Sequence, residues 1–468
     1  MSSTLAVIGH VVLDLLLGWA LLGLRTVGPP GAVHLPAAFL LGLYAETLFV
    51  GSLVLCGVPL LPAMVVMAAV AAAVIAAAAR RGALKAPRGS VPPLRWYEWL
   101  VLVSVAEKVA FACWQLARLP LYFDDASTHW SGRARALFGG VNWSVDPESP
   151  VWLGTRGGLG HRHYPLLAIV WRAETAVVSG GWDDLLARAD GVLFLVALVA
   201  TVWAAVWDFS RSRWLAALGA FVTAAIPLLA WHAAAGYSDI AVAAFSFASL
   251  AALLRREWLL AGVLAAGAAW SKNDGLVLFL PATLVGTCLL AGPGRPERLR
   301  AVAWFLGGCA TLAPWLVAKY VLSLGVTPND DKLSWHPDTF ELLWDYVVTG
   351  PTSSILWVGV GIGICGGSRA LLRDRTGRAL LAALAVTCVA TFFVFGCTSA
   401  HVWLSNQMTV HRIMLQIAPL AVFVSFYAAW LRIRPDHGGV ALPVRTASVP
   451  ARATGPSRSI PKPGSATR

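Results

Sequence analysis

Long apolar stretches recur along almost the whole chain of 468 residues, and they constrain its fold more than any other feature. Stretches of roughly 18–22 apolar residues are long enough to cross the roughly 30 Å of bilayer hydrocarbon as helices. The sequence is 58% hydrophobic and 13% charged, whereas about a quarter of the residues of a soluble domain are charged. We therefore predict an all-α integral membrane protein.

The basic residues between the apolar stretches indicate which loops face the cytoplasm, because Lys and Arg accumulate on that side. About thirteen membrane helices result, with the N-terminus outside and the C-terminus inside. The first stretch lacks a basic segment before it and a cleavage site after it, so it is predicted to be a retained helix and not a signal peptide. The predicted spans lie near 5–24, 35–56, 60–79, 97–117, 185–207, 214–232, 238–254, 257–270, 275–291, 300–323, 352–371, 379–397 and 412–431.

The loops without basic clusters are then predicted to lie together on the external face. The first and longest, 118–184, includes an apolar stretch from Leu166 to Val178 that Arg172 and Glu174 interrupt. A span there would place every later basic cluster outside, so the stretch is predicted to be an in-plane helix on the external surface. The other external loops are 232–237, 271–274, 324–351 and 398–411.

The pattern divides the chain into three regions. Residues 1–96 hold three N-terminal helices and a basic cytoplasmic loop, and residues 97–431 hold the remaining helices. Residues 432–468 are rich in Ser, Pro and Arg and are predicted to form a disordered cytoplasmic tail. The formal charge of +12 is accounted for by the cytoplasmic loops, so no nucleic-acid partner is predicted. The seven cysteines form no CxxC pair, which indicates neither a disulfide framework nor a zinc ribbon.

Carboxylates that could carry chemistry lie at the external ends of two predicted spans. Asp124 and Asp125 open the first external loop, where partial desolvation raises a carboxylate pKa and suits it to general-base catalysis. Either residue could instead cap the short helix predicted from Ala126. Asp239 could likewise cap its helix, but a second carboxylate at this depth permits a two-carboxylate site or a divalent metal site with Asp125.

Cationic side chains are predicted on the same face. Lys272 belongs to a hairpin too short to leave the membrane interface, where it can snorkel, pair with Asp274 or hold a phosphate. Arg412, at the external entry of the last span, can anchor its helix or bind a lipid phosphate in bidentate fashion. His161 and His163 have no third ligand at a zinc-binding spacing, which favours a contact with an anion over a zinc site.

Five sequence elements, in this order within residues 97–431, resemble motifs of bacterial GT-C fold glycosyltransferases. This family includes the protein mannosyltransferases and the aminoarabinose transferases of lipid A. The chain departs from the pattern in its three extra N-terminal helices and in having no soluble C-terminal domain. The elements are Phe123-Asp-Asp125-Ala-Ser-Thr-His-Trp130-Ser-Gly-Arg133, His163-Tyr164-Pro165-Leu166-Leu167, Gly236-Tyr237-Ser238-Asp239, Trp270-Ser-Lys272-Asn-Asp274-Gly275 and His411-Arg412-Ile-Met-Leu415-Gln416-Ile-Ala-Pro419.

The resemblance implies a GT-C type multi-span helical bundle in the plasma membrane, acting as a monomer, with a long first external loop containing in-plane helices. Such an enzyme transfers a sugar, with inversion, from a polyprenyl-phospho-sugar donor to a lipid, glycan or protein acceptor on the external face. Asp125 falls on the general-base position and Asp124 one place early, while Asp239 would orient the base or share a divalent cation with it. Residues implied to bind the donor phosphate are Lys272, Arg412, His163 and Arg133, and those implied to contact substrate are Trp130, Tyr164, Tyr237 and Asp274.

Two other functions remain open at this point. A lipid-linked glycan polymerase or ligase also has many spans and a large external loop, although its arginine-rich external loops are not evident here. A transporter would have inverted repeats and ionisable residues at the bilayer midplane. Glu107 and Lys108, in the fourth predicted span, are the pair that fits this second expectation.

Overall fold

In the computed structural model, every residue described below belongs to the segment Met1–Pro435. The structure describes residues 3–25, 34–84, 94–121, 125–155, 161–324, 333–349, 354–405 and 408–433. Across these residues the chain is helical, and its sole β-type pairing is an isolated bridge between Ser144 and Trp152. The predicted all-α fold is confirmed for this part of the chain. Asp124 and the tail from residue 434 lie outside the described residues.

Nine helices in the described ranges are long and apolar enough to cross a membrane. Seven of the predicted spans appear as single uninterrupted helices at the expected positions. Two others are extended by short helical segments: α7 precedes α8, and a turn of 3₁₀ helix, η4, joins α14 to α15. The bounds are α1 Ser3–Arg25, α2 Leu35–Leu55, α3 Leu60–Arg80, α4 Trp96–Arg118, α7 Asp184–Ala187, α8 Ala189–Ser210, α14 Arg295–Cys309, η4 Ala310–Leu312, α15 Ala313–Val321, α17 Ser354–Arg373, α18 Arg375–Cys397 and α20 Met408–Ile433.

The span predicted near 214–232 is wrong as a single straight helix. It consists of α9 (Arg213–Ala224) and α10 (Pro227–Ala235), which are bent by 59° relative to each other. Pro227 opens α10, and Ile226 before it has the extended conformation that a residue preceding proline prefers. Proline therefore ends the first helix and starts the second in a new direction.

Three predicted spans form helices shorter than a full membrane crossing. Two of them, α11 (Asp239–Leu254) and α12 (Trp258–Ser271), are buried along almost their whole length. The third begins as one turn of π-helix, η3 (Gly275–Phe279), and continues as α13 (Leu280–Leu290). Because neighbouring helices cover them, their apolar composition reflects burial within the protein as well as contact with lipid.

The helix predicted within the first external loop is present, but its position differs from the prediction. It is α6 (Leu167–Ser179), and every residue from Leu167 to Ala176 is buried. Helices α1 and α2 pack against it together with the short helix α5 (Arg133–Gly139). It is therefore an internal helix and not a surface one, since the N-terminal helices cover the face that was expected to meet the bilayer.

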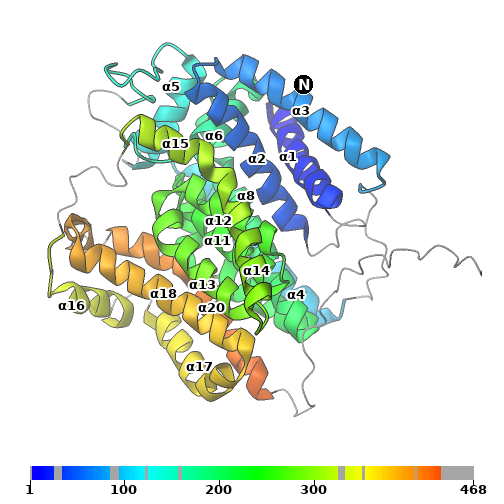
Figure 1. The fold of residues 1–468 in the computed structure, drawn as a ribbon, viewed down its shortest axis with the longest axis vertical. Coiled ribbons are helices and arrows are strands. Elements are labelled where there is room, and N and C mark those ends of the chain that lie inside the picture. Colours follow the sequence, from blue (N-terminus) through cyan, green and yellow to red (C-terminus); the bar gives the residue numbers. More distant parts are fainter. Residues whose placement is uncertain are drawn as a thin grey trace, which may run out of the picture. The chain divides into compact units, whose positions relative to one another are not determined.

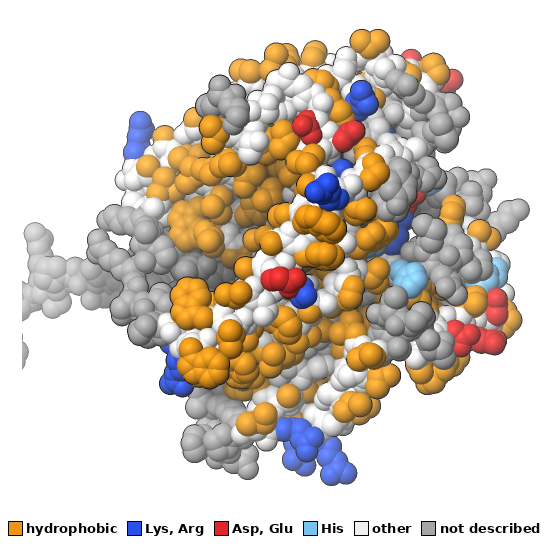
Figure 2. Space-filling model, turned by 180° about the vertical axis from the view of Figure 1, so that it is seen from behind, with side chains coloured by type: hydrophobic (Ala, Val, Ile, Leu, Met, Phe, Trp, Pro, Cys, Tyr) orange, Lys and Arg blue, Asp and Glu red, His pale blue; other side chains and the backbone are white. Residues whose placement is uncertain are grey.

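The N-terminal helices and the C-terminal helices form separate groups on either side of α11 and α12. Helices α1, α2 and α3 pack on one another, whereas α17, α18 and α20 form the second group (Figure 1). Helix α20 packs along α11, which places the last predicted span beside the centre of the protein. Hydrophobic side chains form broad patches on one face of the molecule, with several charged side chains between them (Figure 2). Such a surface is typical of helices that contact lipid.

Basic residues from different predicted cytoplasmic loops meet at one end of the bundle. Arg375 interacts electrostatically with Arg256, Arg298 and Arg378, and its Nε donates to the carbonyl of Leu289. These residues follow α11, open α14 and open α18, so three loops share one end. Three loops that the sequence sorts together therefore lie at the same end of the bundle.

The pair that suggested a transporter lies on the outside of its helix. Glu107 and Lys108 form an ion pair of 2.9 Å with each other, and their side chains are 57% and 36% exposed. Both side chains therefore lie at the surface of α4 and not in the interior of the bundle.

Candidate functional site

Segments that are far apart in the sequence bring their charged side chains together at the end of the bundle opposite the basic loops. Asp125 precedes the π-helix η2 (Ala126–Gly132), and Asp239 begins α11. Lys272 and Asp274 lie between α12 and η3, and Arg412 lies in the first turns of α20. We call this set, with Gln416, the charged network. It unites most of the acidic and basic side chains that the sequence singled out.

Arg412 links two of the carboxylates. Its Nε donates to Asp239 Oδ2 at 3.0 Å, and its Nη1 donates to Asp125 Oδ2, although 173 and 287 residues separate the partners. The guanidinium also lies over the ring of Tyr237, 4.6 Å from the ring centroid. A cation held on an aromatic face keeps its orientation, because the electrostatic attraction favours one side of the ring. His129 makes a further contact of 3.3 Å with Asp125.

Lys272 and Gln416 complete the network around Asp239. The Lys272 Nζ lies 2.9 Å from Asp239 Oδ1 and 2.7 Å from Asp274 Oδ2. The Gln416 amide donates to the same two carboxylates, at 2.7 and 2.9 Å. Asp239 is fully buried, whereas the side chains of Asp125 and Asp274 are 27% and 23% exposed. The network therefore opens to the outside at Asp125 and Asp274, with Asp239 beneath them.

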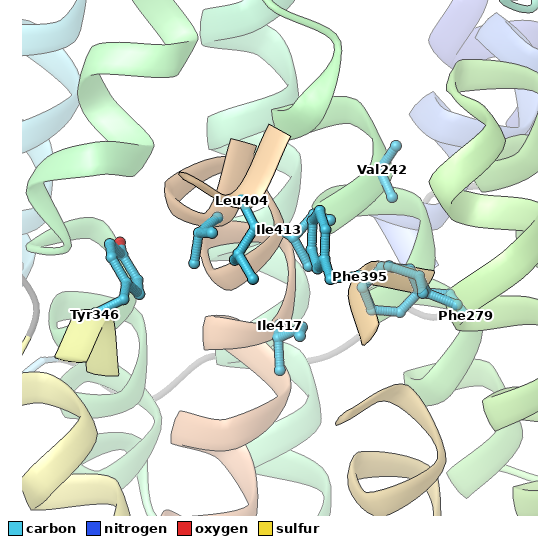
Figure 3. Close-up of a cluster of buried hydrophobic side chains, with 9 residues drawn as sticks. Val242, Phe279, Tyr346, Phe395, Leu404, Ile413 and Ile417 are labelled. Atoms are coloured by element: carbon cyan, nitrogen blue, oxygen red, sulfur yellow. The ribbon is translucent and has the colours of Figure 1, made fainter. Parts of the chain in front are cut away.

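The orientation of α20 follows from its sequence. Arg412 and Gln416 are four residues apart and so share one face of the helix. Ile413 and Ile417 form the adjacent stripe and point into a buried apolar cluster (Figure 3). The cluster fixes the rotation of α20 about its axis, and this rotation directs Arg412 and Gln416 toward Asp239. The cluster contains Val242, Leu278, Phe279, Tyr346, Phe395, Leu404, Val410, Ile413 and Ile417.

Neighbouring charges keep Asp125 and Lys272 ionised. Burial would raise the pKa of Asp125, but the hydrogen bond from His129 and the Arg412 guanidinium outweigh it and hold this pKa below its usual range. Burial would lower the pKa of Lys272, but Asp239 and Asp274 raise it above its usual value. With three carboxylates against two cations, the network carries a formal charge of −1. An incoming anion must therefore displace a carboxylate in order to bind a cation here.

The charged network is the strongest indication of function in the chain. No family model, no curated protein and no solved structure matches this chain. The chemistry of the site must accordingly be inferred from its own residues and their geometry.

A ring cluster borders the network on the side of the first loop. Trp130 is fully buried and stacks on Tyr164 with 5.2 Å between ring centroids. His161 and His163 contact the same tyrosine ring. Burial lowers the pKa of His163 to about 3 and that of His161 to about 4. The lowered pKa values favour the neutral form of both imidazoles near pH 7, in which a ring N–H of His163 could still donate to a phosphate.

Arg133, which the sequence suggested as a phosphate contact, instead donates hydrogen bonds to backbone carbonyls of the first loop. It is fully buried, and its guanidinium donates to the carbonyls of Leu153, His161 and Tyr164. Burial lowers its pKa to about 9. In this arrangement Arg133 holds the loop that carries the ring cluster and does not face the opening of the network.

The carboxylates expected to share a metal are bridged by a side chain. The Arg412 guanidinium contacts both Asp125 and Asp239, so their oxygens are already engaged with a cation. Among the described residues, the only group of three or more potential metal ligands lies elsewhere, in α1 and α2. The geometry here does not fit a divalent ion between Asp125 and Asp239.

Sequence reasoning missed two sets of residues that position the site. Arg172 and Asp190 form a fully buried ion pair, and Arg172 also donates to Ser131 Oγ and to the carbonyl of Gly236. This pair ties α6 and α8 to the segments that carry Asp125 and Asp239. Lys319 donates to the carbonyl of His163 and to the side-chain oxygen of Asn273. The signal that could have revealed Arg172 was its place in an apolar stretch, where a charge needs a partner.

Proposed function

We propose that this protein is a GT-C type membrane glycosyltransferase that transfers a sugar, with inversion, from a polyprenyl-phospho-sugar to an acceptor hydroxyl. The observation that carries the proposal is the convergence of Lys272 and Arg412 on Asp239 beside the partly exposed Asp125. Two cations suit a phosphate, and a carboxylate next to them suits a general base. Lipid, glycan and protein acceptors all present the required hydroxyl.

An apolar cavity next to the network supports a lipid-linked donor. It has a volume of about 280 Å³ and is lined by Met414, Leu415 and Ala418 of α20, together with Ile355 and Trp357 of α17. Ile355 is 89% exposed, so the cavity opens at the surface of α17. Leu415, which lines the cavity, is three residues after Arg412 in α20 and so lies on nearly the same side of the helix. A phosphate-binding cation would thus lie within one helical turn of a surface that suits a polyprenyl chain.

The resting geometry suggests how donor binding would activate Asp125. The donor phosphate would take the place of Asp125 at Arg412, while Asp239 continues to hold Arg412 and Lys272. Asp125 would lose the positive charge that depresses its pKa and would become a stronger base. The Asp125 carboxylate would then be strongly basic only when donor is present.

The transfer step follows from that arrangement. Asp125 accepts the proton of the acceptor hydroxyl while the hydroxyl oxygen forms a bond to the anomeric carbon. The bond from that carbon to the phosphate oxygen breaks, and the electron pair leaves with the prenyl phosphate. Lys272 and Arg412 stabilise the resulting charge, as preorganised cations do where negative charge develops. No metal ion is required by this scheme, and Asp239 acts by positioning both cations.

We also propose that the site lies on the external side of the plasma membrane. The support is the position of the network at the end opposite the basic residues Arg256, Arg298, Arg375 and Arg378. Basic loops remain in the cytoplasm, which would leave the network on the external side, where lipid-linked donors with outward-facing sugars are used. The enzyme is proposed to act as a monomer.

Donor binding in cation variants tests the proposal. The full chain in detergent is titrated with a panel of radiolabelled prenyl-phospho-sugars, and transfer is then measured in membranes. Lys272→Ala and Arg412→Ala should each weaken binding of the accepted donor by tenfold or more, about 1.4 kcal/mol. Arg412→Lys should rescue binding only in part, because a lysine lacks the bidentate fork. The two losses should be less than additive in the double variant, because both cations act on one phosphate.

Lys108→Ala is the matched control, since it removes an exposed cation distant from the network. It should bind donor as the wild type does. Folded double-variant protein that binds the donor with wild-type affinity would contradict the proposed function.

A further inference from the structure

The N-terminal helices, which the proposed site does not use, contain a second group of polar side chains. His10 and Asp14 lie in α1, and Glu46 lies in α2. All three are at least nine-tenths buried, and their potential ligand atoms lie within 4.8 Å of one another. His10 Nε2 is 3.2 Å from both carboxylate oxygens of Glu46. Apolar membrane helices rarely carry such a group without a function.

We propose that His10, Asp14 and Glu46 bind one divalent transition-metal ion. One imidazole nitrogen and two carboxylates form a mixed ligand set that suits Zn²⁺ or Mn²⁺ better than Ca²⁺ or Mg²⁺, which favour oxygen ligands alone. The three side chains must move slightly closer to one another to form bonds of roughly 2.0–2.2 Å to such an ion.

An additional carboxylate nearby points independently to a missing cation. Glu174 of α6 is fully buried, and neither of its side-chain oxygens has a hydrogen-bond partner among the described residues. It interacts electrostatically with Glu46, and the charges acting on Asp14 are those of Glu46 and Glu174. Three carboxyl groups thus lie close together in a buried setting. A divalent ion bound here would favour their ionised forms, because it places positive charge beside them.

The surroundings hold the ligands in a fixed orientation. Trp171 of α6 donates its indole N–H to Asp14 Oδ2 at 3.2 Å, and its ring stacks on His10 with 5.5 Å between centroids. Outer hydrogen bonds of this kind orient the ligands of a metal. A Cβ at Gly42 would lie 1.8 Å from the backbone oxygen of Asp14, so this glycine allows α1 and α2 to approach closely beside the ligands.

A bound ion would join α1 to α2 and, through Trp171, hold α6 against them. Glu46 precedes Thr47, whose hydroxyl accepts a hydrogen bond from Trp270 at the end of α12. The metal site would therefore stabilise the helices that support the charged network without contributing a ligand to it. This role is independent of the proposed transferase activity.

Metal content and thermal stability of the full chain in detergent test the proposal. Protein treated with a chelator is incubated with Zn²⁺ or Mn²⁺, and bound metal is measured by mass spectrometry after removal of free ion. Wild-type protein should retain about one ion per chain and melt at a higher temperature with the ion than without it. His10→Ala and Glu46→Gln should lose the ion and the thermal shift together.

Two further variants keep the test decisive if a ligand variant does not fold. Trp171→Phe retains the ring but removes the N–H, and should weaken metal binding roughly 10–100-fold. Glu107→Gln, on the exposed face of α4, should bind metal as the wild type does. The proposal would be overturned if wild-type protein treated with a chelator takes up neither ion. It would also be overturned if the His10→Ala variant retains a full equivalent of metal.

Discussion

At the scale of single residues, the candidate site depends on a competition for Arg412. The guanidinium contacts Asp125 and Asp239, and only Asp125 is partly exposed. A buried carboxylate that loses a partner would be left uncompensated at high cost, whereas a carboxylate at the opening can be rehydrated. Asp125 is therefore the partner that a phosphate can replace, and Asp239 is the one that remains.

Replacement of the proposed base should separate chemistry from binding. Asp125→Asn should lower the rate of sugar transfer roughly 10²–10⁴-fold, because an amide cannot accept the proton. Donor affinity should be unchanged or higher, since Arg412 no longer needs to be released from a carboxylate. Radiolabelled transfer and donor titration on the same preparation measure the two effects.

Asp124→Asn is the control within the same sequence element, and its effect on transfer should be less than tenfold, about 1.4 kcal/mol. The register of the motif assigns the base to Asp125 and not to its neighbour. An inactive Asp124→Asn variant together with a nearly normal Asp125→Asn variant would show that this register is wrong by one residue.

The lowered pKa of His163 predicts how the stability of the protein depends on pH. Its folded-state pKa is lowered to about 3, below the unfolded value of about 6.5. Between these values the unfolded chain binds more protons, so stability falls as the pH is lowered below about 6.5, by at most about 1.4 kcal/mol per pH unit for this residue. The melting temperature should decrease from pH 7 to pH 5. His163→Gln should flatten this decrease, and an unchanged pH profile in that variant would exclude the residue as its cause.

At the scale of helices, the buried side chain of Arg172 connects α6 to the first loop and to the rest of the bundle. Arg172 reaches Asp190, Ser131 and the carbonyl of Gly236, so one guanidinium contacts three separate segments. A buried charge of this kind is stable only while its partners are present. The ion pair is therefore expected to determine whether the segments with Asp125 and Asp239 stay in register.

Loss of one partner of this pair should destabilise the protein strongly. Asp190→Asn leaves the Arg172 charge uncompensated, and should cost about 3–5 kcal/mol, seen as a lowered melting temperature in detergent. The double variant Arg172→Met, Asp190→Leu should recover part of this loss. Glu107→Gln breaks an exposed pair and should change stability by no more than about 1 kcal/mol. A single Asp190→Asn variant as stable as Glu107→Gln would contradict this account.

At the scale of the whole molecule, the charged network and the basic residues lie at opposite ends of the bundle, and the two ends should lie on opposite sides of the membrane. Val141 is 88% exposed in the first loop, and Glu297 is exposed beside the basic residues. In a chain whose native cysteines are replaced by alanine, Val141→Cys should react with an impermeant maleimide added to intact cells. Glu297→Cys should react only after the cells are opened. Labelling of position 297 in intact cells would reverse the orientation.

Local sequence patterns were sufficient to predict the helices and to group several of their loops. Apolar length and the positions of basic residues are local properties, so thirteen helical regions could be located, and loops could be sorted onto common ends. The residues Asp125, Asp239, Lys272 and Arg412 were selected in the same way, since each stands at the predicted external end of an apolar stretch. The bend at Pro227 was missed because an apolar count does not register where a helix changes direction.

Which charged groups contact one another depends on how distant helices pack. Arg412 contacts Asp125 and Asp239, which are 287 and 173 residues away, and no local pattern encodes such pairing. Arg133 and Arg412 have the same side chain, yet carbonyls surround the first and carboxylates the second. The burial of α6 likewise depends on α1 and α2, which precede it by more than a hundred residues. Packing between distant helices sets the dielectric surroundings and partners of each charge, and these determine whether it supports the fold or remains available to a ligand.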